Sequence, residues 1–288
     1  MSDVFGISIS ALQAFQTALQ VTSNNIANAN TPGYDKESVE LTSAIPQSAG
    51  SAPIGAGVNV VGISRAYSQL SANQLNISQS NLGQLNSLQN YTSQIDNIVG
   101  TTAGGLSTAI QNYYSAWSTL SNDPTSTASR QALLSAAQSV SAAFSSTNGQ
   151  LQGLNSNINS AITADVTQIN SLSTSISALN QQIVTGTADA GGQPPNDLID
   201  QRDQLVSNLS KLVGVTTTAG SNGTVNVFVG NGQPLVLGNV TTALTTIPNQ
   251  FNAVLHVPIL PPVRVVLRKA YAMRTETGRA RIGCAFVS

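Results

Sequence analysis

Ser23-Asn24-Asn25-Ile26-Ala27-Asn28-Ala29-Asn30-Thr31-Pro32-Gly33-Tyr34 follows an uncharged, partly apolar segment at the start of the chain. Pro32 lacks a backbone N–H and disfavours helical geometry at the residue before it, so it predicts the end of a helix. Gly33 permits a left-handed turn directly afterwards. The side chains of Asn28 and Asn30 can bond backbone groups that a helix end leaves free. We therefore expect a helix of roughly 20 residues that stops in a tight turn.

The helix before this turn is predicted to carry one apolar stripe. Phe5, Leu12, Leu19 and Ile26 recur every seven residues, with Ile9 and Phe15 on the same side, and no charged residue lies between Val4 and Tyr34. A stripe this narrow forms no globular core by itself, so the helix needs partner helices. The residues expected to pack in a polymer are Phe5, Leu12, Phe15, Leu19 and Ile26.

The stretch after the stripe resembles the signature of the axial proteins of the bacterial flagellum, which are the rod, hook and hook-associated proteins. The residues that carry the resemblance are Asn24, Asn25, Asn28, Asn30, Thr31, Pro32, Gly33 and Tyr34. A bare Thr-Pro-Gly would be an ordinary helix stop, but the asparagine run before it favours the flagellar family. The resemblance implies a structural protein, neither an enzyme nor a cofactor-binding or metal-binding protein, whose terminal helices polymerise around an export channel.

Composition is compatible with this family. Only 8% of the 288 residues are charged and 5% are aromatic. A single cysteine, Cys284, excludes an intrachain disulfide framework. We expect no transmembrane helix, because no run approaches 18 apolar residues, and no cleaved signal peptide, because the N-terminus lacks a basic region. The resemblance implies export through the flagellar type III apparatus with an uncleaved signal, and an extracellular location in the flagellum.

Helical periodicity dominates the middle of the chain. We expect helices over Ala66–Val99, over Leu106–Leu120 with a stop at Asn122-Asp123-Pro124, and over Thr127–Val184. One unbroken helix over the last range would be about 85 Å long, although Gly149 and Gly153 are candidate kinks. The fold class predicted is mainly α, an elongated rod of long, coiled-coil-like helices; a compact bundle of separate helices is the alternative. The heptad seam of the longest helix comprises Leu151, Leu154, Ile158, Ile162, Ile169, Leu172, Ile176, Leu179 and Ile183.

Beyond Gly214 the apolar residues recur at every second position instead of at helical spacing. A loop over Thr185–Asn196 and a short helix over Asp197–Val213 precede this change. Alternating apolar residues with hairpin signals at Asn222-Gly223 and Asn231-Gly232 predict a small β-rich portion. The domains expected are 1–34, the polymerisation helix and its turn; 35–213, the helical rod; 214–250, the start of the β-rich domain; and 251–288, a basic tail.

A second motif narrows the resemblance. The segment from Asp197 to Leu205, with Asp197, Asp200, Arg202 and Asp203, is similar to the hook-associated protein 1 family of the hook–filament junction. That resemblance implies an adaptor that contacts hook protein and the second junction protein and associates with itself in a ring. It also implies an export chaperone and the type III exporter as partners, with no nucleic acid and no membrane insertion. The alternatives are another axial protein of hook or rod, and a secreted coiled-coil adhesin or effector.

The spacing of the aspartates in the second motif would suit a metal or acid–base site, but no His or Cys lies nearby. We instead expect Arg202 and Lys211 to form ion pairs, and Asp197 to serve the helix N-terminus.

The last 38 residues differ from the rest. Residues 1–250 hold 5 Lys and Arg against 11 Asp and Glu, whereas residues 251–288 hold 6 against 1. The only His and the only Cys also lie in this tail. We expect a frameshift or premature end near Phe251, with a genuine basic extension as the alternative. Nucleic-acid binding by the tail is disfavoured, because the remaining chain is acidic and lacks an interleaved aromatic platform.

Overall fold

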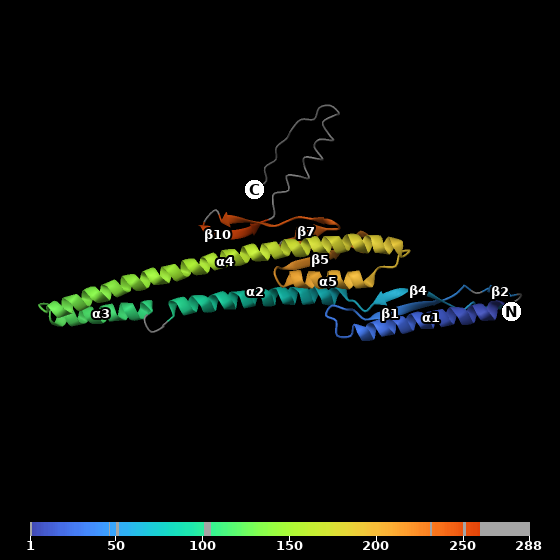
Figure 1. Cartoon of the computed structure of the whole chain (residues 1–288), viewed down its shortest axis with the longest axis horizontal. Helices are drawn as coiled ribbons and strands as arrows, with labels where there is room; N and C mark the ends of the chain where they lie inside the picture. Colours follow the sequence, from blue (N-terminus) through green and yellow to red (C-terminus); the bar gives the residue numbers. More distant parts are fainter. Residues whose placement is uncertain are drawn as a thin grey trace, which may run out of the picture.

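The protein is an elongated assembly of long helices, seen here in a computed structural model that describes residues 2–45, 47–49, 52–100, 105–230, 232–249 and 252–259. In Figure 1, α4 runs along most of the long axis, α2 and α3 follow one another beside it, and α1 lies near one end. This confirms the predicted helical rod, and the compact bundle is wrong. The helices are α1 (Ser2–Ala27), α2 (Gln69–Val99), α3 (Leu106–Asn122), α4 (Thr127–Asp189) and α5 (Asn196–Ser210).

Helix α4 is one continuous element of 63 residues, about 95 Å long, and it runs unbroken through both candidate kink glycines. It begins where the sequence predicts, because the Ser126 hydroxyl caps the first turn by accepting the Ser129 N–H at 3.2 Å. Arg130 donates to the Pro124 carbonyl at 2.8 and 3.0 Å and so closes the turn from α3. The helix ends at Asp189, so the predicted loop begins later than expected.

The apolar core lies where α5 and a sheet pack on the C-terminal half of α4. The sheet is a four-stranded antiparallel meander of β5 (Val215–Ala219), β6 (Val225–Val229), β7 (Gln233–Leu237) and β8 (Val240–Thr241). Ile176 and Ile183 from the predicted seam are fully buried there, with Leu209 of α5 and Leu235 of β7. Elsewhere the seam is more open, and Leu151 is 41% exposed.

Backbone geometry and one buried amide hold this sheet in place. Asn222 and Gly223 have φ values of 55° and 76° in the turn between β5 and β6, as the predicted hairpin requires. The other predicted hairpin turn is flanked by Gly230 and Gly232, both at positive φ, and its Asn231 lies outside the described residues. The fully buried Asn180 of α4 donates to the Val225 and Gly238 carbonyls at 2.9 and 2.6 Å.

The N-terminal module, defined here as α1 with the strands up to Arg65, forms the other part of the molecule. β1 (Glu37–Ser43) turns back along α1 and pairs antiparallel with β4 (Val58–Arg65); β2 (Gln47–Ala49) and β3 (Ala52–Ile54) form a short hairpin between them. Both β1 and β4 contact α1. Helix α1 thus packs against strands that lie beyond residue 34, and the predicted domain bounds stay a prediction.

Backbone pairing continues past the predicted change of character at Phe251, which itself lies outside the described residues. β9 (Thr245–Asn249) pairs antiparallel with β10 (Asn252–Ile259), and β10 also contacts α4. Residues 260–288 are outside the described part of the chain. The expectation of an aberrant basic tail therefore stays a prediction.

Candidate functional site

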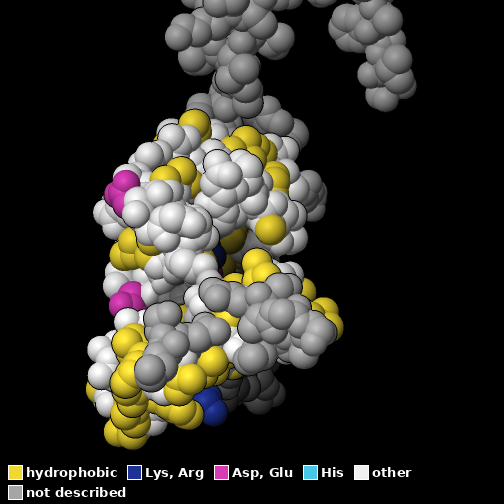
Figure 2. Space-filling view, turned by 90° about the vertical axis from the view of Figure 1, so that its right-hand side faces the viewer, with side chains coloured by type: hydrophobic (Ala, Val, Ile, Leu, Met, Phe, Trp, Pro, Cys, Tyr) yellow, Lys and Arg dark blue, Asp and Glu magenta, His cyan; other side chains and the backbone are white. Residues whose placement is uncertain are grey.

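Helix α1 has two faces of opposite character. Ala14 and Val21 are 4% and 7% exposed on the face packed against β1 and β4. The predicted stripe lies on the other face, where five large apolar side chains are between 62% and 72% exposed. Figure 2 looks onto the end of the molecule near α1 and shows hydrophobic side chains gathered along its lower edge. The stripe residues are Phe5 (71%), Leu12 (62%), Phe15 (69%), Leu19 (67%) and Ile26 (72%).

The same helix is long and apolar enough over Val4–Ala27 to cross a membrane, judged by length and composition alone. The expectation of no transmembrane helix rested on the lack of a continuous apolar run, whereas the average hydropathy of this helix meets the criterion. The buried face carries groups with polar partners in the module, however. Ser10 Oγ accepts the Val58 N–H at 3.3 Å, and Asn25 Nδ2 donates to the Glu37 carbonyl at 2.9 Å.

The chain reverses at the predicted turn. The Thr31 carbonyl accepts the Tyr34 N–H at 3.2 Å, and Gly33 has φ +85°. These features fit a type II β-turn with Pro32 at its second position, which proline prefers. A side chain on Gly33 would also run into Gln204 of α5. Helix α1 already ends at Ala27, earlier than the proline requires.

An asparagine side chain accounts for the early end of α1. Asn28 Nδ2 donates to the Asn24 carbonyl at 3.2 Å and to Asn24 Oδ1 at 2.9 Å, so a side chain competes for a helical acceptor. Thr31 in turn donates to Asn28 Oδ1 at 3.2 Å. Asn30 is exposed and makes no side-chain hydrogen bond to any described residue, so of the two asparagines expected to bond the backbone only Asn28 does.

Asn25 fixes the strand that follows the turn. Its Oδ1 accepts the Glu37 N–H at 2.8 Å while its Nδ2 donates to the Glu37 carbonyl, so the amide imitates a neighbouring strand at the edge of β1. Tyr34 donates its hydroxyl to the same Oδ1 at 2.9 Å. Burial raises the pKa of Tyr34, with nearby carboxylates led by Glu37 adding to the effect, so the hydroxyl keeps its proton. The asparagines and tyrosine of the motif thus shape the module internally.

The end of the first motif meets the second motif through Arg65, the last residue of β4. One guanidinium nitrogen, Nη2, lies 2.7 Å from Asp35, 2.5 Å from Asp200 and 3.0 Å from Asp203. The Asp35 N–H also donates to Asp200 Oδ2 at 3.1 Å. The Arg65 guanidinium lies over the ring of Tyr67, 4.9 Å from its centroid. Asp35, which directly follows the first motif, and two aspartates of the second motif are thereby brought into one partly buried cluster around Arg65.

Electrostatics in this cluster are dominated by burial and by the excess of carboxylates. Burial raises the pKa of Asp200, outweighing the Asp35 N–H and Arg65, which lower it. Burial also opposes the charge on Arg65, but the hydrogen bond that Arg65 donates to Asp203 and the charges of the surrounding carboxylates raise the Arg65 pKa above its usual value. Arg65 therefore stays charged, and three carboxylates surround it, one of which, Asp203, also pairs with Arg202.

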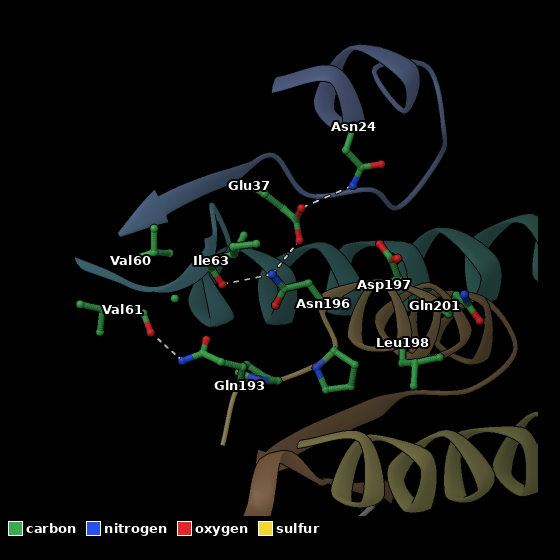
Figure 3. A pocket seen from close by; sticks show the side chains of 13 residues that line it. Asn24, Glu37, Val60, Val61, Ile63, Gln193, Asn196, Asp197, Leu198 and Gln201 are labelled. Carbon is green, nitrogen blue, oxygen red and sulfur yellow. Dashed lines mark hydrogen bonds between the residues drawn. The ribbon is translucent and has the colours of Figure 1, made fainter. Parts of the chain in front are cut away.

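A second set of polar contacts lines a groove of about 630 Å³ next to this cluster (Figure 3). Asn196, at the start of α5, donates to Glu37 Oε1 at 2.6 Å and to the Ile63 carbonyl at 3.2 Å. Gln193 donates to the Val61 carbonyl at 2.7 Å, and Asn24 reaches the other oxygen of Glu37 at 3.5 Å. Most of these contacts join the N-terminal module to the rod, so the groove lies at the boundary between two parts of one chain.

The second-motif residues divide between two tasks. Arg202 donates to the Gly223 carbonyl at 2.7 Å and pairs with Asp203 at 3.0 Å, which ties α5 to the sheet. Asp197 is exposed in the first turn of α5, where a negative charge suits the helix dipole. The expected Lys211 ion pair was wrong, since its ammonium bonds Asn208 Oδ1 at 3.0 Å instead.

The sequence analysis did not identify Arg65, Glu37 and Asn196 as residues that join the N-terminal module to the rod. One signal was available, because Arg65 is one of only 5 basic residues among the first 250. Within the described ranges, no group of three or more His, Cys, Asp or Glu has an arrangement that could hold a metal ion.

Comparison with known families matches both parts of the molecule. The model of the "Flagellar hook-associated protein FlgK helical domain" matches residues 92–260. The model of the "Flagella basal body rod protein" matches residues 6–34, which include most of α1 and the turn after it.

Individual relatives agree with the family models. Flagellar hook-associated protein 1 of Salmonella typhimurium is 36% identical over 249 residues, which are 86% of this chain and 45% of that protein. The Escherichia coli protein of the same name is 34% identical over 249 residues, covering 86% of this chain and 46% of its own length. The chain therefore spans less than half the length of these relatives.

A solved structure shares the fold. The flagellar hook junction protein FlgK from Burkholderia pseudomallei superposes with a TM-score of 0.60 at 36% sequence identity, over 65% of this chain and 33% of that one.

Proposed function

Because the chain belongs to the flagellar hook-associated protein 1 family, we propose that it is a structural, non-enzymatic component of the bacterial flagellum and acts as an adaptor between hook and filament. The relatives are named for association with the hook, and the solved neighbour is a hook junction protein. The chain spans under half the length of those relatives.

The observation that carries the proposal is the exposed stripe of α1. Burying a Leu or Phe contributes about 1.5–3 kcal/mol, so five such side chains held in water represent binding energy not used within this chain. The stripe is exposed although α1 is folded into the module, because the opposite face of the helix packs on β1 and β4. A helix docked on one side and apolar on the other fits lateral packing against further helices.

In this proposal, the stripe packs against terminal helices of neighbouring subunits: further copies of the protein in a ring, hook protein on one side and the second junction protein on the other. The absence of charge between Val4 and Tyr34 allows close helix packing without buried unpaired ions. Membrane insertion of α1 is not part of the proposal. Insertion would break the hydrogen bonds of Asn25 with Glu37 and of Ser10 with Val58 on the buried face of α1.

The route to this location is proposed from the family alone. We infer export by the flagellar type III apparatus, with an export chaperone, to the extracellular flagellum and without a cleaved signal peptide. The cysteine-poor composition is compatible with passage of an unfolded chain.

The test is binding to purified hooks, measured by co-sedimentation and by immunogold labelling of hook ends, with a full-length relative as positive control. A Leu12→Ala and Phe15→Ala double variant should reduce end binding at least tenfold while the protein stays folded. The matched control is Gln13→Ala with Gln20→Ala, which truncates two exposed side chains beside the stripe on the same helix.

Three results would contradict parts of the proposal. Equal binding by both double variants would exclude the stripe as the docking surface. Binding along hook sides with no preference for ends would favour another axial hook or rod role. Failure of the parent chain to bind, with binding by the relative, would leave the family membership intact and remove the adaptor role from this chain.

A further inference from the structure

We propose that Arg65 is a positioning residue: it fixes the N-terminal module on the rod and thereby sets the direction in which the α1 stripe faces its partners. This inference deepens the proposed function and rests on it only for its biological meaning. The physical claim, that one buried arginine determines the angle between two parts of the chain, stands on the contacts alone.

The joint between the module and the rod is polar. Among the described residues, the buried apolar cluster draws its members from α4, α5, the sheet and the segment leading into β9, and takes none from α1 or β1–β4. What crosses the joint instead is the Arg65 cluster, the Asp35 bond to Asp200, and amide bonds from Gln193 and Asn196 to the backbone of β4 and to Glu37. Polar contacts depend more steeply on distance and direction than apolar packing does, so they specify an orientation well.

Arg65 occupies a special place among these contacts. Asp35 belongs to the module, whereas Asp200 and Asp203 come from successive turns of α5, and all three carboxylates meet one nitrogen of Arg65. If the module turned away from α5, Asp200 would lose its counter-charge and Asp203 would keep only its pair with Arg202. Breaking a buried ion pair in this way is strongly unfavourable. The arginine side chain itself is only 8% exposed.

The position of Arg65 in the chain also suits a joint. It is the last residue of β4, and α2 begins at Gln69, so three residues connect the module to the rod on this side. The Ser68 hydroxyl caps α2 by accepting the Ser71 N–H, so the cap fixes the start of α2. A connection this short permits bending about one point, and Arg65 lies directly beside that point.

The test follows the placement of the module on the rod through the distance between two spin labels, measured by double electron–electron resonance. Spin labels are placed on Gln13→Cys in α1 and Gln168→Cys in α4, both exposed, in a Cys284→Ser background. We expect one narrow distance distribution for the parent and a broadened or shifted one for Arg65→Gln. The control is Arg130→Gln, since Arg130 bonds the Pro124 carbonyl at the turn between α3 and α4, away from the joint. The control should keep the parent distribution.

A rescue variant separates the role of charge from that of side-chain shape. Because the three carboxylates converge on a single nitrogen, a lysine ammonium can satisfy them, and Arg65→Lys should restore the narrow distribution. This differs from bidentate sites, where lysine is a poor substitute. A lysine variant as broad as the glutamine variant would contradict the role of the converging charge.

A distribution for Arg65→Gln that equals the parent, with helical content unchanged by circular dichroism, would overturn the inference and assign the joint to Gln193 and Asn196. If Arg65→Gln does not fold, Asp203→Asn removes one carboxylate of the same cluster and should broaden the distances in the same sense. The measurement uses no hook. Failure of hook binding therefore counts against the proposed function, and unchanged distances count against this inference only.

Discussion

Helix α5 has two sides that stabilise the molecule by different means. Toward α4 and the sheet it contributes Val206 and Leu209, which are 4% and 0% exposed in the apolar core. Toward the N-terminal module it presents Asp200 and Asp203, which bind Arg65. Apolar packing supplies most of the free energy of folding, whereas polar contacts specify geometry. The comparison indicates that stability resides in the sheet end of the rod and that orientation is set at the joint.

The largest effect on stability should come from Leu209→Ala. Truncating a fully buried leucine costs roughly 2–5 kcal/mol in the free energy of unfolding, since a cavity remains in the core. Urea denaturation followed by circular dichroism measures this change. Leu237→Ala is the control, because that leucine lies on β7 of the same sheet but is 46% exposed, and it should change stability by less than about 1 kcal/mol. Equal losses for the two variants would contradict a core confined to the buried positions.

The next effect should be local to the module. Asn25→Ala removes the amide that bonds both backbone groups of Glu37, leaving them and the Tyr34 hydroxyl without that partner, at a cost of about 1–3 kcal/mol. We expect the Glu37 amide to exchange hydrogen roughly tenfold to a hundredfold faster, with amides of α4 unchanged. Asn30→Ala is a matched control within the same motif, because Asn30 is exposed. Faster exchange in α4 as well would show that module and rod open together.

A smaller effect concerns the charge of Asp200. Its pKa is raised in the folded protein above the usual 3.8, so the folded state binds the proton more tightly than the unfolded state does. The contribution of Asp200 is therefore most favourable at acid pH and declines as the pH rises through the folded pKa. Asp200→Asn removes this titration while keeping an oxygen that can accept the Asp35 N–H.

The measurement for Asp200 is the difference in unfolding free energy between the parent and Asp200→Asn from pH 3 to pH 7. Taking the difference removes the contributions that the two proteins share. The parent should lose stability relative to the variant as the pH rises. A gain instead would mean that the pairing with Arg65 outweighs burial.

Much of the fold could be predicted from periodicity, but the joint could not. The bounds of α3 and the start of α4 followed from Asn122-Asp123-Pro124 and the seam after it, because proline and capping residues act locally. Arg65 and Asp203 are 138 residues apart, and Arg65 belongs to no repeating pattern, so periodicity does not indicate that they pair. A periodic stripe also does not say what covers it. Leu82 and Leu88 lie on α2, a helix that the periodicity predicts, and are 59% and 62% exposed.

The smallest effect on stability should come from the most apolar part of the surface. The Leu12→Ala and Phe15→Ala variant removes two large side chains, but these are 62% and 69% exposed, and alanine favours a helix. Its free energy of unfolding should therefore stay within about 0.5 kcal/mol of the parent. The same variant is expected to lose most binding to hook ends, so one substitution pair would separate assembly from stability. A loss above 2 kcal/mol in the isolated protein would mean that the stripe is already covered within the chain, and the contrast between a stabilising rod and an assembling module would fail.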